Sequence, residues 1–124
     1  MSYTYSKIDK LKSKKIIDQL FNEGHSVSVF PLRMVYLKLS QTNDSEIKCG
    51  VSVSKKNFKK AVDRNHIKRL LREAYRLNKA RYFNNISEPY ALMILYIGKD
   101  GTDFESVNKK MTQLLEAFTK KVSQ

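Results

Sequence analysis

The chain has 124 residues, of which 41% are apolar, and it contains seven Tyr and six Phe. This length predicts a single domain over residues 1–124, and this apolar content excludes a disordered basic tail. Lys and Arg number 24 against 12 Asp and Glu, and the net charge of +12 favours a nucleic acid as the partner. No apolar run reaches 18 residues, so we expect neither a transmembrane helix nor a membrane partner.

The N-terminal third predicts one short helix and two strands. We expect residues 1–12 to be flexible, Ser13 to cap the first helix, and Gly24 to close it as the C′ residue. The apolar face of this helix would carry Ile16, Ile17, Leu20 and Phe21. Strands are expected at residues 26–29 and 32–39, with Pro31 marking the break between them.

Residues 47–53 alternate between apolar and polar side chains, which is the clearest strand pattern in the chain. A polar turn at residues 41–45 precedes them, so we expect strands 32–39 and 47–53 to form an antiparallel pair. The lone cysteine, Cys49, lies in this pattern and is interpreted as a small buried apolar residue. A single cysteine forms no internal disulfide, which agrees with a reducing cytoplasm, and the first 15 residues lack a signal-peptide pattern.

A basic helix is predicted at about residues 59–78 and is the centre of the sequence. Its apolar face carries Ile67, Leu70, Leu71 and Ala74, and its opposite face carries Arg64, Lys68, Arg72 and Arg76 at four-residue spacing. Like charges at this spacing repel each other, so such a row indicates a polyanionic ligand. Residues 55–81 contain eleven cations and only Asp63 and Glu73 as acids. The alternative is that these cations form an ordinary solvent-exposed helix face, but such a face would carry more acidic residues between the cations.

The C-terminal part predicts a buried strand and a last helix. Residues 90–97 are continuously apolar, as expected for a strand that is covered on both faces. Residues 102–105 fit a capping box that starts at Thr102. The last helix would bury Val107, Met111, Leu114, Leu115, Phe118 and Val122. The order α-β-β-β-α-β-α predicts an α+β fold, with helices packed on a single-layer, mostly antiparallel, four-stranded sheet.

The sequence shows no pattern typical of a protein catalytic centre. The two histidines, His25 and His66, have no metal-ligand spacing, the acids are scattered, and the four glycines form no phosphate loop. We therefore expect no catalytic residue, no metal site and no bound cofactor in the protein. A self-sufficient protein nuclease does not fit this pattern.

The basic helix and the strand before it resemble the bacterial ribonuclease P protein subunit family. Residues 51–56 read VSVSKK and residues 61–73 read AVDRNHIKRLLRE. The family has Ser-Lys-Lys after a strand, then Arg-Asn-Arg and Lys-Arg-x-x-Arg on a helix, and the spacing matches without a gap. His66 stands at the third position of the Arg-Asn-Arg motif, where histidine makes a weaker and pH-dependent phosphate contact.

The resemblance implies an accessory protein subunit of an endoribonuclease, in which a large RNA with bound Mg²⁺ carries the catalysis. The protein would bind that RNA, one copy per RNA, and also bind the single-stranded 5′ leader of precursor tRNA. The resemblance also implies a left-handed β-α-β crossover around the basic helix, where the general rule predicts a right-handed one.

Two groups of residues follow for these roles. The face toward the RNA subunit would comprise Lys55, Lys56, Lys59, Lys60, Arg64, Asn65, His66, Lys68, Arg69, Arg72 and Arg76. The leader cleft would comprise Ile17, Phe21 and Tyr36. From the residues alone, Asn65 suits either RNA contact or bonding within its helix, and the rings of Phe21 and Tyr36 suit either base stacking or the core.

Two other classes stay open at this point. A non-catalytic RNA-binding module, such as a small ribosomal protein or an RNA chaperone, would use the same charges. A DNA-binding helix-turn-helix is the third possibility, but strands before and after the basic helix argue against it, because that motif expects a short preceding helix.

Overall fold

The computed structural model describes residues 14–39, 47–84, 86 and 88–123, and it confirms the predicted order of elements. The elements are α1 (Lys14–Glu23), β1 (His25–Val29), β2 (Leu32–Lys38), β3 (Ile47–Val53), α2 (Ala61–Phe83), β4 (Tyr90–Tyr96) and α3 (Phe104–Val122). The predictions for residues 1–12, Ser13 and the turn at 41–45 lie outside the described residues.

The four strands form one mixed sheet in the order β1-β2-β4-β3. β1 pairs with β2 and β2 pairs with β4 in antiparallel fashion, whereas β3 pairs with β4 in parallel. The mostly antiparallel α+β fold is confirmed, but the predicted pair of strands 32–39 and 47–53 is wrong because β4 lies between them. β4 is apolar on both faces, and only a central position buries both.

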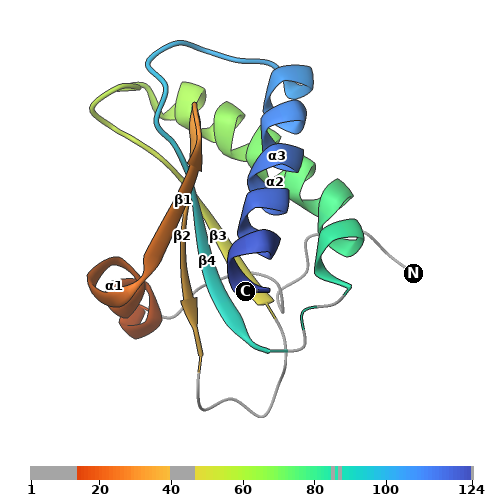
Figure 1. The fold of residues 1–124 in the computed structure, drawn as a ribbon. Helices are drawn as coiled ribbons and strands as arrows, with labels where there is room; N and C mark the ends of the chain where they lie inside the picture. The colour runs from red at the N-terminus through yellow and green to blue at the C-terminus, as the bar shows by residue number, and fades with distance from the viewer. Residues whose placement is uncertain (1–13, 40–46, 85, 87, 124) are drawn as a thin grey trace.

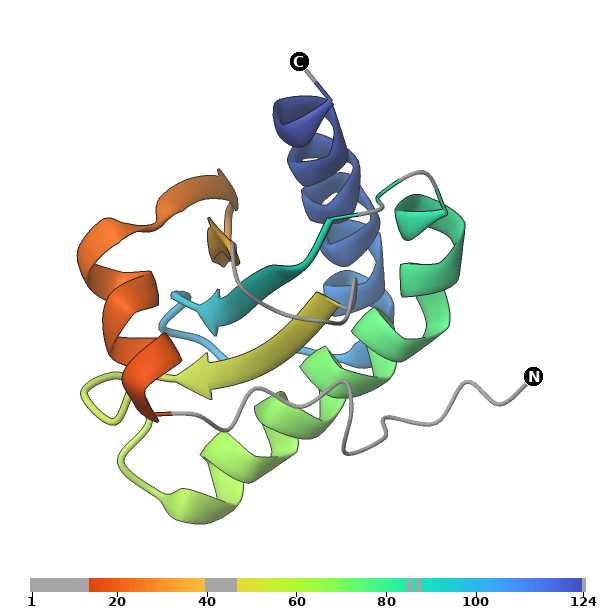
Figure 2. The same ribbon diagram turned by 90° about the horizontal axis from the view of Figure 1, so that it is seen from below.

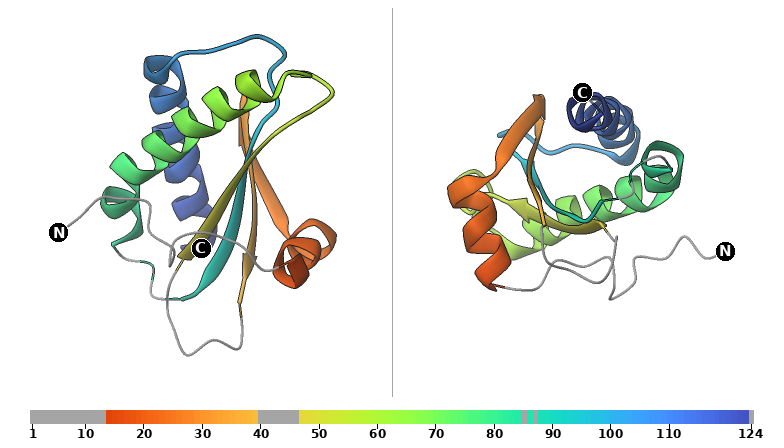
Figure 3. Two further views of the ribbon diagram at one scale, coloured as in Figure 1. Left: turned by 180° about the vertical axis from the view of Figure 1, so that it is seen from behind. Right: turned by 60° about the horizontal axis from the view of Figure 1, so that its bottom comes forward.

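Helix α2 connects the parallel neighbours β3 and β4. Seen from the side of α2 with β3 running upward, β4 lies to the left of β3 (Figures 1 and 3). The crossover is therefore left-handed, as the resemblance implied and against the general preference.

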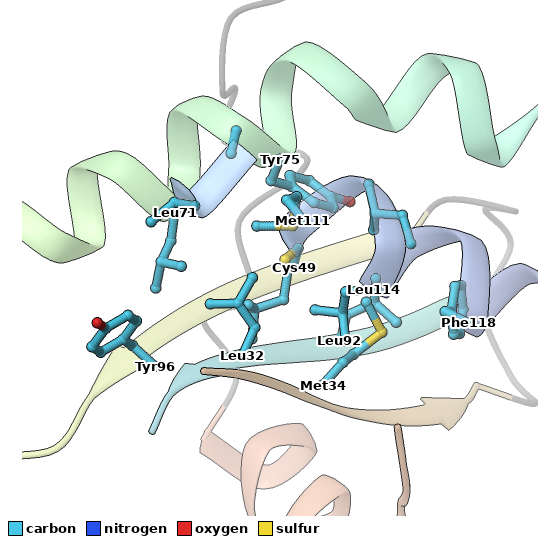
Figure 4. Close-up of a cluster of buried hydrophobic side chains, with 14 of the residues drawn as sticks. Leu32, Met34, Cys49, Leu71, Tyr75, Leu92, Tyr96, Met111, Leu114 and Phe118 are labelled. Atoms are coloured by element: carbon cyan, nitrogen blue, oxygen red, sulfur yellow. The ribbon is translucent and has the colours of Figure 1, made fainter. Parts of the chain in front are cut away.

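Helices cover both faces of the sheet (Figures 1 and 2). α2 and α3 pack on one face around the main core, in which Phe118 contacts the rings of Tyr36, Phe83 and Tyr90 at centroid distances of 5.1, 5.8 and 5.5 Å. Figure 4 shows Leu71 and Tyr75 of α2 above this layer, with Cys49 buried below as predicted. α1 packs on the opposite face, where Leu20 meets Val35, Ala91 and Met93.

The predicted end of α1 at Gly24 is confirmed, but two other helix boundaries need correction. Gly24 follows α1 as expected, but its φ is not positive; a Cβ there would lie 2.3 Å from the carbonyl oxygen of Leu20. α2 runs from Ala61 to Phe83, not 59–78, because its last turn packs Phe83 against the main core. α3 is capped by Asp103, which accepts from the backbone N–H of Ser106 at 2.9 Å, and not by Thr102.

Candidate nucleic-acid interface

The outer face of α2 carries the predicted basic row. The buried residues of this helix are Ile67, Leu71, Ala74 and Tyr75, so its opposite side faces away from the sheet. Asn65, His66, Arg69 and Arg72 are exposed, whereas Arg64, Lys68 and Arg76 are half-buried. The structure therefore brings all seven predicted α2 residues to the accessible part of one helix.

Arg64 combines a surface charge with a structural contact. Its Nη1 donates to the backbone carbonyls of Phe58 and Lys59 at 2.8 and 2.9 Å. These bonds tie the first turn of α2 to the loop before it. The remaining N–H groups of the guanidinium stay available for phosphate oxygens.

Glu73 is a functional neighbour that the sequence analysis did not single out. Its carboxylate receives hydrogen bonds from the guanidinium of Arg76, three residues later, including one from Nε at 3.2 Å. The hydrogen bond from Arg76 holds the pKa of Glu73 below its usual range, so the carboxylate is ionised at neutral pH. The i,i+3 spacing of an acid and an arginine is the signal that could have revealed this pair.

A shallow hollow of about 340 Å³ lies along this face of α2, lined by Asn65, Arg69, Arg72, Glu73 and Arg76. Guanidinium groups bind phosphate oxygens through paired N–H donors. The amide of Asn65 and the carboxylate of Glu73 add acceptors that suit hydroxyl or amino groups of a nucleotide. The hollow can thus receive part of an RNA strand and not only a bare phosphate.

Four further lysines extend the basic surface beyond the helix. Lys55, Lys56, Lys59 and Lys60 are all exposed on the loop between β3 and α2. The loop is ordered by a bond from the N–H of Lys56 to Oγ of Ser54 at 3.1 Å. The exposed loop lysines therefore come directly before the accessible basic row of α2 in the chain.

The predicted leader-cleft residues do not all lie together. Ile17 packs in the α1 cluster, and Phe21 is 52% exposed on α1. Tyr36 is buried in the main core on the other face of the sheet, beside Phe118 and with the ring of His25 at 5.7 Å. The alternation of side chains along β2 separates Tyr36 from α1, since successive residues point to opposite faces.

The residues that β2 and β4 present to the α1 side were missed. Val35, Ala91 and Met93 lie under α1, and the cross-strand row of Ser28, Arg33, Leu95 and Ser52 follows on the same face. Arg33 and Ser28 are exposed. The period-two pattern of β2 could have placed Val35 opposite Tyr36.

Known proteins are similar to this chain in both sequence and fold. A family model described as Ribonuclease P matches residues 5–119. The chain belongs to the ribonuclease P protein family. The ribonuclease P protein component of Porphyromonas gingivalis is 38% identical over 117 residues, which cover 92% of this chain and 85% of that protein. That of Chlorobium phaeobacteroides is 32% identical over 118 residues, covering 85% and 81%.

Solved ribonuclease P proteins show the same fold. The protein from Thermotoga maritima superposes with a TM-score of 0.69 at 25% identity and covers 87% of this chain and 96% of that one. The Staphylococcus aureus protein, at 22% identity and a TM-score of 0.69, supports the fold alone. Membership in the ribonuclease P family brings RNA binding and a part in tRNA processing, and it decides against the ribosomal, chaperone and helix-turn-helix alternatives.

Two features of the described residues bear on other functions. Among residues 14–39, 47–84, 86 and 88–123, no three His, Cys, Asp or Glu side chains gather in a way that could hold a metal ion. Within the same ranges, no helix has the length and apolar character needed to cross a membrane.

Proposed function

We propose that this chain is the protein subunit of a ribonuclease P whose RNA subunit cuts the 5′ leader from precursor tRNA. The observation that carries the proposal is the accessible row of cations on α2, with the exposed lysines of its preceding loop, in a chain of the ribonuclease P family. Eleven predicted contact residues lie on accessible parts of this face. RNA phosphates that bind there release counterions, so affinity should fall steeply with salt.

The leader of precursor tRNA would bind on the α1 side of the sheet. Phe21 offers an exposed ring for stacking, and Ile17 offers apolar contact. Arg33 is exposed on the neighbouring part of the sheet and can meet the leader phosphates. Tyr36 lies on the opposite face, so we do not include it in the proposed leader site.

Mg²⁺ would be held by the RNA subunit and its substrate. The described acids of the protein do not fit a Mg²⁺ site, since no three of the potential ligand side chains gather. The basic face of the protein would act by screening the repulsion between RNA phosphates. The protein would thus supply binding and positioning, with no nucleophile and no general base.

We further propose a cytoplasmic assembly with one protein per RNA subunit. The chain contains a single cysteine, the buried Cys49, so no disulfide forms within the chain, which suits a reducing compartment. The predicted RNA-subunit contacts lie on one helix and the loop before it, which suits the docking of a single RNA.

The decisive test is cleavage of precursor tRNA by a bacterial ribonuclease P RNA at low Mg²⁺, with and without the protein. We expect cleavage at the mature 5′ end only when both are present. Binding without stimulation would reduce the protein to a general RNA-binding module, and cleavage by the protein alone would contradict the proposed division of labour.

The leader contact is tested with substrates that carry leaders of one and ten nucleotides. Wild-type protein should favour the longer leader, and Phe21→Ala should reduce this preference. His25→Ala serves as the matched control, because the exposed ring of His25 lies beside Tyr36 on the face of the sheet opposite α1. Equal leader preference in Phe21→Ala and wild type would remove Phe21 from the leader site.

A further inference from the structure

Three connections meet at the end of the sheet away from α1. They are the β1–β2 turn at residues 30–31, the β3–α2 loop at 54–60 and the β4–α3 loop at 97–102. Figures 1 and 3 show all three at the same end of the sheet. We call these residues the loop rim.

The loop rim is held together by its own hydrogen bonds. The N–H of Ile97 donates to the carbonyl of Pro31 at 2.8 Å, and Nδ2 of Asn57 donates to the carbonyl of Gly98 at 3.4 Å. The ring of Phe58 lies 5.8 Å from that of Tyr96 in the core. The three connections therefore form a fixed surface, so a side chain displayed there loses little freedom on binding.

Two large apolar side chains are exposed on this fixed surface. Phe30 is 69% exposed, and Ile97, whose backbone bonds to the residue after Phe30, is 38% exposed. Single exposed apolar residues are ordinary on a protein surface. An exposed aromatic ring beside a second apolar residue, on a rigid rim, is a more specific feature.

The charge of the loop rim shows which partner suits this ring. The rim carries Lys55, Lys56, Lys59, Lys60 and Lys99, all exposed, and Asp100 is its only carboxylate. The side-chain ion pairs that the structure gives in its described part lie elsewhere, as in Lys38–Glu88 and Lys120–Glu116. An apolar protein segment would not need these lysines, whereas an unpaired nucleotide needs both a stacking ring and cations for its phosphates.

We propose that the loop rim binds an unpaired nucleotide of the RNA subunit, with its base stacked on Phe30 and its phosphates on the rim lysines. This inference rests on the proposed function and adds a second contact to it. Arg64 supports the choice of the RNA subunit, because it bonds the rim to the basic face of α2. Helix α1, beside which we place the leader, lies near the other end of the sheet (Figure 1).

A direct test uses the absence of tryptophan from the chain. Phe30→Trp creates a single fluorophore on the rim, and stacking on a base quenches indole emission. Gln113→Trp is the matched control, since Gln113 is exposed on α3, outside both the rim and α2. Each variant is titrated with ribonuclease P RNA, with binding followed in parallel by filter retention.

We expect Phe30→Trp emission to be quenched with the same midpoint as RNA binding, and Gln113→Trp emission to change little. Unchanged emission of Phe30→Trp while RNA is bound would overturn the proposal, as would equal quenching at both positions. Quenching by precursor tRNA alone, and not by the RNA subunit, would overturn the choice of partner.

An affinity series separates stacking from charge. Phe30→Ala should weaken binding of the RNA subunit roughly five- to a hundredfold, with Phe30→Tyr close to wild type, because stacking of one base contributes in this range. The slope of affinity against salt should not change in Phe30→Ala, whereas Lys55→Ala should reduce it. If Phe30→Ala binds the RNA subunit as tightly as wild type does, the rim contact is wrong and the proposed function is unaffected. If the wild-type protein fails to bind the RNA subunit, the proposed function itself is wrong.

Discussion

The guanidinium of Arg64 donates a hydrogen bond to the backbone carbonyl of Phe58, with 2.8 Å between Nη1 and the oxygen. Phe58 in turn packs its ring against Tyr96 in the core. Arg64 belongs to the family's sequence motif, and it also helps to hold the basic loop at residues 54–60 in place. Arg69 differs from Arg64 because its side chain is exposed on the outer face of α2.

This difference predicts distinct effects of two alanine substitutions. Arg64→Ala should lower the free energy of unfolding by about 1 kcal/mol through the lost hydrogen bonds, and should also weaken RNA binding. Arg69→Ala should weaken RNA binding with a change in stability within about 0.5 kcal/mol. Urea unfolding and RNA titration of both variants measure the two effects. Unchanged RNA affinity in both variants would remove the α2 face from the docking surface.

Glu73 places a negative charge beside the arginines of α2, so its removal should tighten RNA binding. Glu73→Gln keeps the shape of the side chain while it removes a carboxylate that repels phosphates and pairs with Arg76. We expect roughly two- to fivefold tighter binding at low salt, with the difference fading as salt screens the charge. Glu116→Gln, which removes an acid on α3 that pairs with Lys120, is the control. Weaker binding of Glu73→Gln would mean that holding Arg76 in place matters more than the repulsion.

His66 is exposed on the face of α2, where the family motif has arginine. His66→Arg should preserve or tighten RNA binding at neutral pH, because a guanidinium is charged at every pH and forms paired bonds to phosphate. The same change at His25, which is exposed on β1, is the control. A large loss of affinity in His66→Arg would reveal a specific role for the imidazole.

The cap of α3 predicts a pH dependence of stability. Asp103 accepts from the backbone N–H of Ser106, and this hydrogen bond holds the pKa of its carboxyl below the usual range. The contribution is therefore complete above the unfolded pKa of about 3.9, and it is lost as pH falls through the lower folded pKa. Wild type should unfold at a higher temperature than Asp103→Asn at pH 6, and this gap should close below pH 3. A gap that does not vary with pH would show that the charge of Asp103 has no part in the cap.

The local elements of this protein could be predicted from its sequence, because their signals are periodic and short in range. The face of α2 that buries Ile67 and Leu71 follows from helical spacing, and the row of cations follows on the other side. The buried β4 follows from its continuous apolar run. The motif around Arg64 and Asn65 gave the family, which the comparisons confirm.

The tertiary structure decided how these elements meet. The insertion of β4 between β2 and β3, the packing of α1 on the face opposite α2, and the loop rim depend on contacts between residues far apart in sequence. Tyr36 shows the consequence: its ring suits both stacking and the core, and only the register of β2 against β4 places it beside Phe118. A period of two specifies that neighbouring side chains point to opposite faces, but which face receives which helix depends on the packing of the whole sheet.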